Sequence, residues 1–120
     1  MKILVADDSR VMRQIVARAL RQAGYGHCEV IEAVDGQDAL LKVHTEDPDL
    51  VLSDWSMPRM TGLDLLSTLR RTGDRRPFGF VTSEATSPIR RTAERAGAQF
   101  LLAKPFTADA LREALAPMLG

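Results

Sequence analysis

The sequence contains one cysteine, one tryptophan and one tyrosine among 120 residues, and its 16 basic residues are balanced by 16 acidic residues. A single cysteine excludes an internal disulfide, and Cys28 lies in an apolar segment, so we expect it to be buried in a protein of a reducing compartment. The balanced charge gives no electrostatic reason to expect nucleic acid or an anionic membrane surface as a partner.

Long apolar runs are also missing. No run approaches the roughly 20 residues of a membrane-spanning helix, and the amino terminus enters a strand pattern directly, without the charged and apolar regions of a signal peptide. We therefore expect a cytoplasmic protein. With 45% apolar residues, the chain has the composition and size of one compact domain, residues 1–120, with a substantial core.

Five short apolar runs alternate with segments of helical period. The runs span residues 2–6, 28–33, 50–53, 78–81 and 100–103. We expect a first helix from an N-cap at Ser9 to Gly24, and later helices ending before Asp47, near Gly73 and at Gly97, with the last capped by Thr107. The expected core face of the first helix consists of Val11, Met12, Ile15, Val16, Ala19 and Leu20. This alternation predicts an α/β fold, with a parallel sheet covered by helices on both faces.

Polar residues follow four of these runs at the point where the strand pattern stops. They are Asp7 and Asp8, Asp54, Thr82 and Ser83, and Lys104 and Pro105. Because open parallel sheets bind ligands outside the carboxyl ends of their strands, we expect these side chains to converge. Taken singly, each has an ordinary alternative, such as a helix N-cap for the aspartate pair or a rigid strand exit for Lys104.

Three carboxylates at one edge of a sheet require positive charge. Two like charges about 4 Å apart repel by roughly 4 kcal/mol at an effective dielectric constant near 20. Lys104 supplies one positive charge, and a hard divalent cation with oxygen ligands would supply the rest. Mg²⁺ suits a site with few carboxylates, several waters and a phosphate oxygen. His27 and His44 lie away from the strand ends in the sequence, so a zinc site is not expected.

These segments resemble the receiver domain of two-component response regulators, and within that family the single-domain, CheY-like members. VADDSRVMR is similar to the family's acidic pair and first helix, SDWSMPRMTGLDLL to its phosphorylation segment, VTSEA to its switch segment and AKPF to its lysine-proline segment. The resemblance spans the whole chain. It implies a flavodoxin-like (βα)5 three-layer sandwich in which the five-stranded parallel sheet has the strand order 2-1-3-4-5.

The resemblance also assigns roles to the acidic residues. It implies that Asp54 accepts a phosphoryl group from the phosphohistidine of a sensor histidine kinase of the CheA-like kind. Asp8 and Asp54 would bind Mg²⁺ directly and Asp7 through water, and the backbone carbonyl of Ser56 would complete the protein ligands. Phosphoryl transfer depends on positioning and charge neutralisation more than on elaborate covalent chemistry, so this residue set suits it.

The remaining strand-end residues have implied roles as well. Lys104 would pair first with the Asp54 carboxylate and then with the aspartyl phosphate, and Thr82 would bond a phosphoryl oxygen. The bond between Lys104 and Pro105 is expected to be cis, which only a following proline makes inexpensive. Ser56 and Glu84 occupy positions that, in this family, influence how fast water reaches the phosphate.

Leu101 departs from the family pattern. The family usually has an aromatic residue three positions before the lysine, and its ring moves inward as the threonine moves toward the phosphate. Phe100 is one residue too early, and a shift of one residue places a side chain on the opposite face of a strand. We therefore expect switching through Leu101 to differ from the family's mechanism. Gly79, between two phenylalanines, is also unusual in a central strand.

The resemblance implies a stand-alone, monomeric signalling protein of chemotaxis or motility control that works by binding a downstream partner, because no effector domain follows the last helix. The expected partner surface is the fourth helix, the fifth strand and the fifth helix. It contains Arg90, Arg91, Arg95, Arg112 and Glu113. An ordinary solvated helix face is the alternative interpretation of these charges.

Two other functions are compatible with the fold. A Mg²⁺-dependent phosphohydrolase would also form an aspartyl phosphate, but Ser56 stands where such enzymes often carry a second acid. A flavin carrier would need a hydroxyl-rich phosphate loop after the first strand, where the acidic pair Asp7 and Asp8 lies instead. We therefore expect no enzyme activity beyond the protein's own phosphorylation and dephosphorylation.

Overall fold

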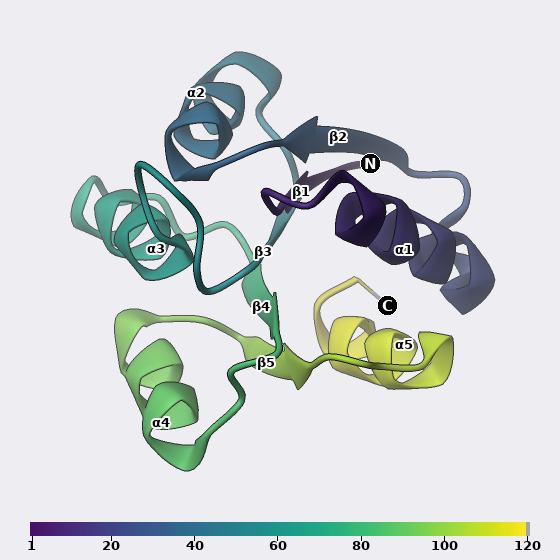
Figure 1. Cartoon of the computed structure of the whole chain (residues 1–120). Helices are drawn as coiled ribbons and strands as arrows, with labels where there is room; N and C mark the ends of the chain where they lie inside the picture. The colour runs from purple at the N-terminus through teal and green to yellow at the C-terminus, as the bar shows by residue number, and fades with distance from the viewer. Residues whose placement is uncertain (120) are drawn as a thin grey trace.

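Five parallel strands form the middle layer of the computed structural model, which describes residues 1–119 (Figure 1). The strands are β1 (Lys2–Ala6), β2 (Glu29–Ala33), β3 (Leu50–Ser53), β4 (Phe78–Thr82) and β5 (Phe100–Ala103). Their order in the sheet is β2-β1-β3-β4-β5, and all neighbouring pairs are parallel. The expected flavodoxin-like α/β fold and strand order are confirmed.

Helices cover both faces of this sheet, as expected. They are α1 (Arg10–Leu20), a π-helical turn η1 (Arg21–Tyr25), α2 (Gly36–Glu46), α3 (Gly62–Arg71), α4 (Ser87–Ala96) and α5 (Ala108–Leu119). Helices α1 and α5 lie on one face, and α2, α3 and α4 lie on the other (Figure 1). Side chains of Ser9, Asp35, Thr61 and Thr86 accept hydrogen bonds from backbone N–H groups at the starts of α1 to α4. Such capping satisfies donors that a helix start leaves free.

Helix α1 presents a different face to the core than the sequence pattern predicts. Val16 and Leu20 are buried as expected, but Val11 and Ile15 are 63% and 45% exposed. Arg13 is buried in their place, one turn before Val16. The prediction that Val11 and Ile15 are core residues is therefore wrong, because the helix is turned to bring a guanidinium group inside.

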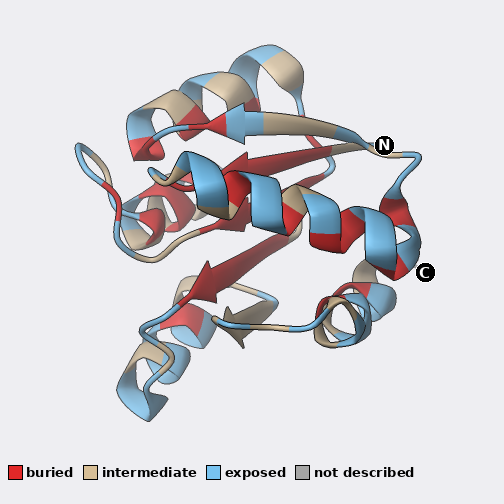
Figure 2. Cartoon of the chain, turned by 45° about the vertical axis from the view of Figure 1, so that its right-hand side comes forward, coloured by how far each residue is buried: buried red, intermediate tan, exposed pale blue. Residues whose placement is uncertain are grey.

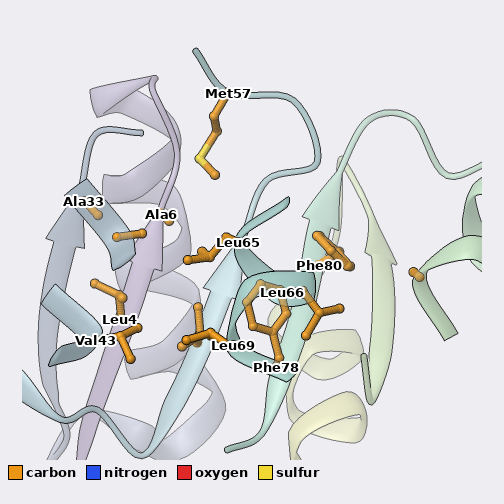
Figure 3. Packing of buried hydrophobic residues seen from close by; sticks show 13 residues of the cluster. Leu4, Ala6, Ala33, Val43, Met57, Leu65, Leu66, Leu69, Phe78 and Phe80 are labelled. Carbon is orange, nitrogen blue, oxygen red and sulfur yellow. The ribbon is translucent and has the colours of Figure 1, made fainter. Parts of the chain in front are cut away.

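The core consists of two apolar clusters, one on each side of the sheet. Figure 3 shows the cluster beneath α3, where Leu65, Leu66 and Leu69 face Phe78 and Phe80 of β4. Strands β1 and β3 are almost entirely buried, whereas the outward faces of the helices are exposed (Figure 2). Burial of each large apolar side chain stabilises the fold by about 1.5–3 kcal/mol, so the central strands are held firmly in register.

Gly79 provides space for an aromatic ring from the neighbouring strand. It lies opposite Phe100 in the β4–β5 register, and a Cβ atom at this position would overlap the Phe100 ring. Close approach of this kind is a common reason for glycine inside a strand. Phe100 packs against the cluster on the α1 and α5 side and Leu101 against the other cluster. The prediction that these two side chains lie on opposite faces is confirmed.

We expect Gly79→Ala to destabilise the protein by about 1–3 kcal/mol, because the new methyl group displaces the ring of Phe100. The overlap disappears in the double variant Gly79→Ala, Phe100→Ala. Its loss of unfolding free energy should therefore be smaller, by about 1 kcal/mol, than the sum of the losses in the two single variants. Urea unfolding of the four proteins measures this coupling. Strictly additive free energies would show that the ring does not occupy the space above Gly79.

Two further expectations have clear outcomes. Among residues 1–119, no helix is long and apolar enough to span a bilayer. Cys28 lies one residue before β2 and is only half-buried, so the prediction that it is buried within a strand is wrong. The strand begins later because pairing of β2 with β1 starts at Lys2 and Glu29.

Candidate functional site

The three strand-end aspartates meet at the carboxyl edge of the sheet. Strands β1 and β3 are adjacent, and Asp7 and Asp54 continue directly from their ends. The N–H of Asp54 donates to the carbonyl of Ala6, and the N–H of Asp7 donates to the carbonyl of Ala33, which fixes both residues. One carboxylate oxygen from each of Asp7, Asp8 and Asp54 lies within 4.8 Å of the other two. The predicted convergence is therefore present.

Lys104 lies between two of these carboxylates. Its Nζ is 2.9 Å from Oδ2 of Asp7 and 3.4 Å from Oδ2 of Asp54. Pairing with Asp54 was expected, but the shorter contact is to Asp7, the more buried of the two partners. The bond between Lys104 and Pro105 is cis, as expected. One ammonium group thus serves two carboxylates.

The charge balance at Asp54 is unfavourable without a further cation. Burial raises the pKa of the Asp54 carboxyl above its usual value; Lys104 opposes this shift, and the nearby charge of Asp7 adds to it. A hydrogen bond of 2.7 Å from the backbone N–H of Trp55 to Oδ1 also favours the ionised form, but the net shift is upward. A hard divalent cation with oxygen ligands fits this donor set, because it would stabilise all three ionised carboxylates.

We expect Asp54→Asn to stabilise the metal-free protein at neutral pH by on the order of 1 kcal/mol, the usual gain from removing an unfavourable charge. The pKa of Asp54 is raised in the folded state, so its ionisation costs stability above that pKa. This cost disappears as the pH falls through the folded pKa. The gain should therefore shrink on acidification in thermal melts with EDTA, and a gain that stays constant down to acidic pH would contradict this prediction.

Thr82 is the last residue of β4 and is fully buried. Its Oγ1 accepts a hydrogen bond of 3.1 Å from the backbone N–H of Glu84, and its carbonyl accepts one of 2.9 Å from the N–H of Lys104. Thr82, at the end of β4, and Lys104, one residue past the end of β5, are thus neighbours. The side chain of Glu84 in turn accepts a hydrogen bond of 2.8 Å from the hydroxyl of Ser56. This bond links the segment after Asp54 to the segment after Thr82.

Sequence reasoning missed two residues that hold the site in place. Arg13 donates from Nη1 to the carbonyl of Asp7 at 2.7 Å and from Nε to Glu32 at 2.8 Å. Gly62, at the start of α3, lies so close to Asp54 that a Cβ atom would overlap the Asp54 carbonyl oxygen. Arg13 could have been found from its position three residues before Val16. Residues at this spacing share one face of a helix, so Arg13 lies on the core side.

An ion pair between Arg59 and Asp35 holds the loop that follows Asp54. Nε of Arg59 lies 2.7 Å from Oδ2 of Asp35, a buried carboxylate that also caps α2. The backbone N–H of Asp38 and the hydrogen bond from Arg59 hold the pKa of Asp35 below its usual value. Arg59 has a φ of 67°, a conformation that residues other than glycine rarely adopt. An ion pair to Asp35, at the start of α2, therefore holds the loop between Asp54 and α3.

The arginines expected on one partner surface are spread over several places. Arg90 lines a groove of about 410 Å³ between α4 and β5 and donates to the carbonyl of Leu101 at 2.9 Å. Arg95 lines a different hollow at the far end of α4, and Arg112 lies near η1 and pairs with Asp109 at 2.7 Å. These three arginines therefore line three different hollows.

Together, fold and site define the chain as a flavodoxin-like α/β protein with a carboxylate and lysine site at the carboxyl edge of its sheet. Residues 3–116 match the sequence profile described as the response regulator receiver domain. The chain belongs to this family.

Its relatives include chemotaxis proteins. The chain is 41% identical to chemotaxis protein CheY of Pseudomonas aeruginosa over 94% of this chain and 91% of that protein. It is 40% identical to chemotaxis protein CheY-3 of Vibrio cholerae, over 96% of this chain and 88% of that one. The solved structure of CheY4 of Vibrio cholerae is similar, with a TM-score of 0.85, 34% identity and 98% coverage of both chains. The chain is thus a CheY-like receiver domain of two-component signalling, a family of signalling proteins and not of metabolic enzymes.

Proposed function

We propose that this chain is a stand-alone response regulator, with residues 1–120 as one receiver domain, that accepts a phosphoryl group on Asp54 and signals by binding a partner. The observation that carries this proposal is the position of the Asp54 carboxylate, 15% exposed, beside two further carboxylates and 3.4 Å from Lys104. The chemotaxis relatives support a role in chemotaxis or motility control in the cytoplasm.

In the proposed transfer, a carboxylate oxygen of Asp54 attacks the phosphorus of a phosphohistidine on a sensor kinase. The P–O bond forms as the P–N bond breaks, and the imidazole nitrogen keeps the bonding electrons. The sheet edge holds Asp54 in position through its N–H bond to Ala6, while the Trp55 N–H fixes its Oδ1. Positioning of this kind is most of what phosphoryl transfer requires from a protein.

The family's metal suits the residues present. Asp8 and Asp54 would hold Mg²⁺ directly, Asp7 would hold it through water, and the backbone carbonyl of Ser56 would be the remaining protein ligand. All four offer oxygen, which Mg²⁺ prefers. When bound, the ion supplies positive charge for the transferred phosphoryl oxygens. Asp7 is kept in place meanwhile by Arg13 and by the N–H of Ser9, which donates to its Oδ1 at 2.9 Å.

Lys104 and Thr82 would respond to the new phosphate. Lys104 already contacts both Asp7 and Asp54, so it can follow the added negative charge by a small shift between them. Thr82 would exchange its bond with the Glu84 N–H for one to a phosphoryl oxygen. That exchange would move the segment after β4, which Ser56 also contacts through Glu84. Glu84 and Ser56 would therefore affect the lifetime of the phosphorylated state.

The proposed output surface is α4, β5 and α5, with the groove between α4 and β5 at its centre. Leu101 and Ala93 contribute apolar contact area to this groove, and Arg90 closes it with its bond to β5. Leu101 takes the place of the family's aromatic residue, so movement of Thr82 would be transmitted through a smaller side chain. A CheA-like kinase and a downstream target protein are the proposed partners of a monomer.

Trp55 makes the proposal testable by fluorescence. Its ring packs edge-to-face against Phe80, with ring centroids 4.9 Å apart, directly beside the acceptor. We expect a change in emission when Mg²⁺ is added, and a second, saturable change when beryllium fluoride, a phosphate mimic, follows. Asp54→Asn should lose the second change, while Asp109→Asn should keep both. A full beryllium fluoride response in Asp54→Asn would contradict the assignment of the acceptor.

A further inference from the structure

We propose that a hollow at the end of the molecule opposite Asp54 binds a compact anion that carries several phosphate groups. Helix α3 connects the two places, since it begins with Gly62 against Asp54 and ends with Arg71 at the hollow. Ten helical residues span roughly 15 Å, so the two sites are separate. This inference does not depend on the proposed phosphorylation of Asp54.

The hollow is lined by basic residues, and the charge of Asp74 acts on only one of them, Arg70. It has a volume of about 600 Å³ and is lined by Arg70, Arg71, Arg75, Arg95, Gly97 and Gln99, together with Ala96. None of these lining residues is acidic. Of the two nearest carboxylates in the sequence, Asp74 pairs with Arg76 at 2.9 Å, and Glu94 lines the neighbouring groove. Four arginines thus line one shallow, open hollow.

Arg70 forms the fixed base of this hollow. Its Nη1 donates to the carbonyl of Asp74 and its Nη2 to the carbonyl of Gly97, each at 2.9 Å, which ties the ends of α3 and α4 together. Gly97 has a φ of 102° and ends α4, and a Cβ atom there would lie 2.9 Å from Nε of Arg70. Burial, and to a smaller extent the neighbouring charge of Arg75, lower the pKa of the Arg70 guanidinium, while the charge of Asp74 opposes this shift.

The other three guanidinium groups remain available to a ligand. Arg71 has only a 3.4 Å contact with the hydroxyl of Thr68, and Arg75 only a 3.4 Å contact with the carbonyl of Arg70. Within residues 1–119, the side chain of Arg95 makes no hydrogen bond and no ion pair. Arg71, Arg75 and Arg95 are exposed, and a bound anion would gain attraction to all three.

The shape and chemistry of the hollow favour phosphate groups over other anions. The planar guanidinium fork matches phosphate oxygens in pairs, and several such groups together suit an anion of high charge density. No aromatic or large aliphatic side chain lines the hollow, so it offers neither a stacking surface for a base nor an apolar anchor for a peptide. Its volume lies within the usual range for a small-molecule site.

Titration calorimetry with inorganic tripolyphosphate in low-salt buffer with EDTA tests the proposal. EDTA removes divalent cations, so the acidic pocket repels the probe and cannot contribute. We expect one tripolyphosphate per chain, unchanged affinity in Asp54→Asn, and at least tenfold weaker binding in the double variant Arg71→Gln, Arg95→Gln. Both of these arginines are exposed, and circular dichroism melts verify that the variant folds.

The double variant Arg18→Gln, Arg21→Gln is the matched control, because it removes the same charge from exposed positions on the α1 side. It should bind tripolyphosphate as the wild type does. Equal weakening in both double variants would show nonspecific attraction and would overturn the proposal, as would absence of binding to the wild type. Tighter binding of hexaglutamate than of tripolyphosphate would also overturn it, in favour of an acidic protein segment.

Discussion

A protein with Asp54→Asn will accept no phosphoryl group from a small acyl phosphate in the presence of Mg²⁺, whereas the wild type will gain one per chain. The asparagine amide has nearly the size of the carboxylate but is not a nucleophile, so the P–O bond to the protein cannot form. Intact-protein mass spectrometry measures the gain directly. Digestion should place the phosphate on the segment around Asp54, and brief treatment with base should remove it.

Two control variants distinguish loss of the phosphoryl acceptor from loss of Mg²⁺ binding or of an unrelated carboxylate. Asp109→Asn, on α5, should gain phosphate as the wild type does. Asp8→Asn keeps the acceptor but removes a proposed metal ligand, so it should gain phosphate slowly and require more Mg²⁺. Phosphorylation of Asp54→Asn to the wild-type level would move the acceptor to another residue and refute the proposed function.

Gly62→Ala should destabilise the protein by about 3 kcal/mol or more and lower its melting temperature by roughly 10 °C or more. The new Cβ would overlap the carbonyl oxygen of Asp54 and would lie 2.9 Å from Oγ of Ser53 and from the Phe80 ring. A backbone oxygen at the end of a buried strand cannot move without moving the strand. Because that strand carries Asp54, the Trp55 response to beryllium fluoride should weaken as well.

Gly26→Ala is the control for this experiment. Gly26 has ordinary helical backbone angles, and a Cβ there would make only van der Waals contacts, the nearest at 3.7 Å with Arg21. It should change the free energy of unfolding by less than about 0.5 kcal/mol. Equal effects of the two substitutions would show that the contact beneath Asp54 is not tight.

Much of the fold could be predicted because strand ends and helix caps are local signals. Ser9 caps α1 because its side chain reaches the N–H of Met12, and Gly97 ends α4 in a left-handed conformation. In a parallel sheet every strand points the same way, so residues after β1 and β3 had to meet once the strand order was known. The acidic cluster therefore followed from sequence positions and topology alone.

Other features could not be predicted because they depend on contacts between distant segments. Whether Arg13 or Val11 faces the core is decided by the carbonyl of Asp7 and by Glu32, which the helix pattern does not contain. The reason for Gly79 is the ring of Phe100 on another strand. The basic hollow also joins the ends of two separate helices, so charges that look unrelated along the chain share one surface.

The contact between Lys104 and Asp7 joins residues 97 positions apart in the sequence. Asp7, Asp8 and Asp54 come together as soon as β1 and β3 pair, yet their counter-charge arrives only with β5 at the edge of the sheet. The first half of the chain therefore contains all three acidic residues but not the ammonium group that pairs with them. A chain that ends before β5 would have to hold its aspartates together against their repulsion, without Lys104.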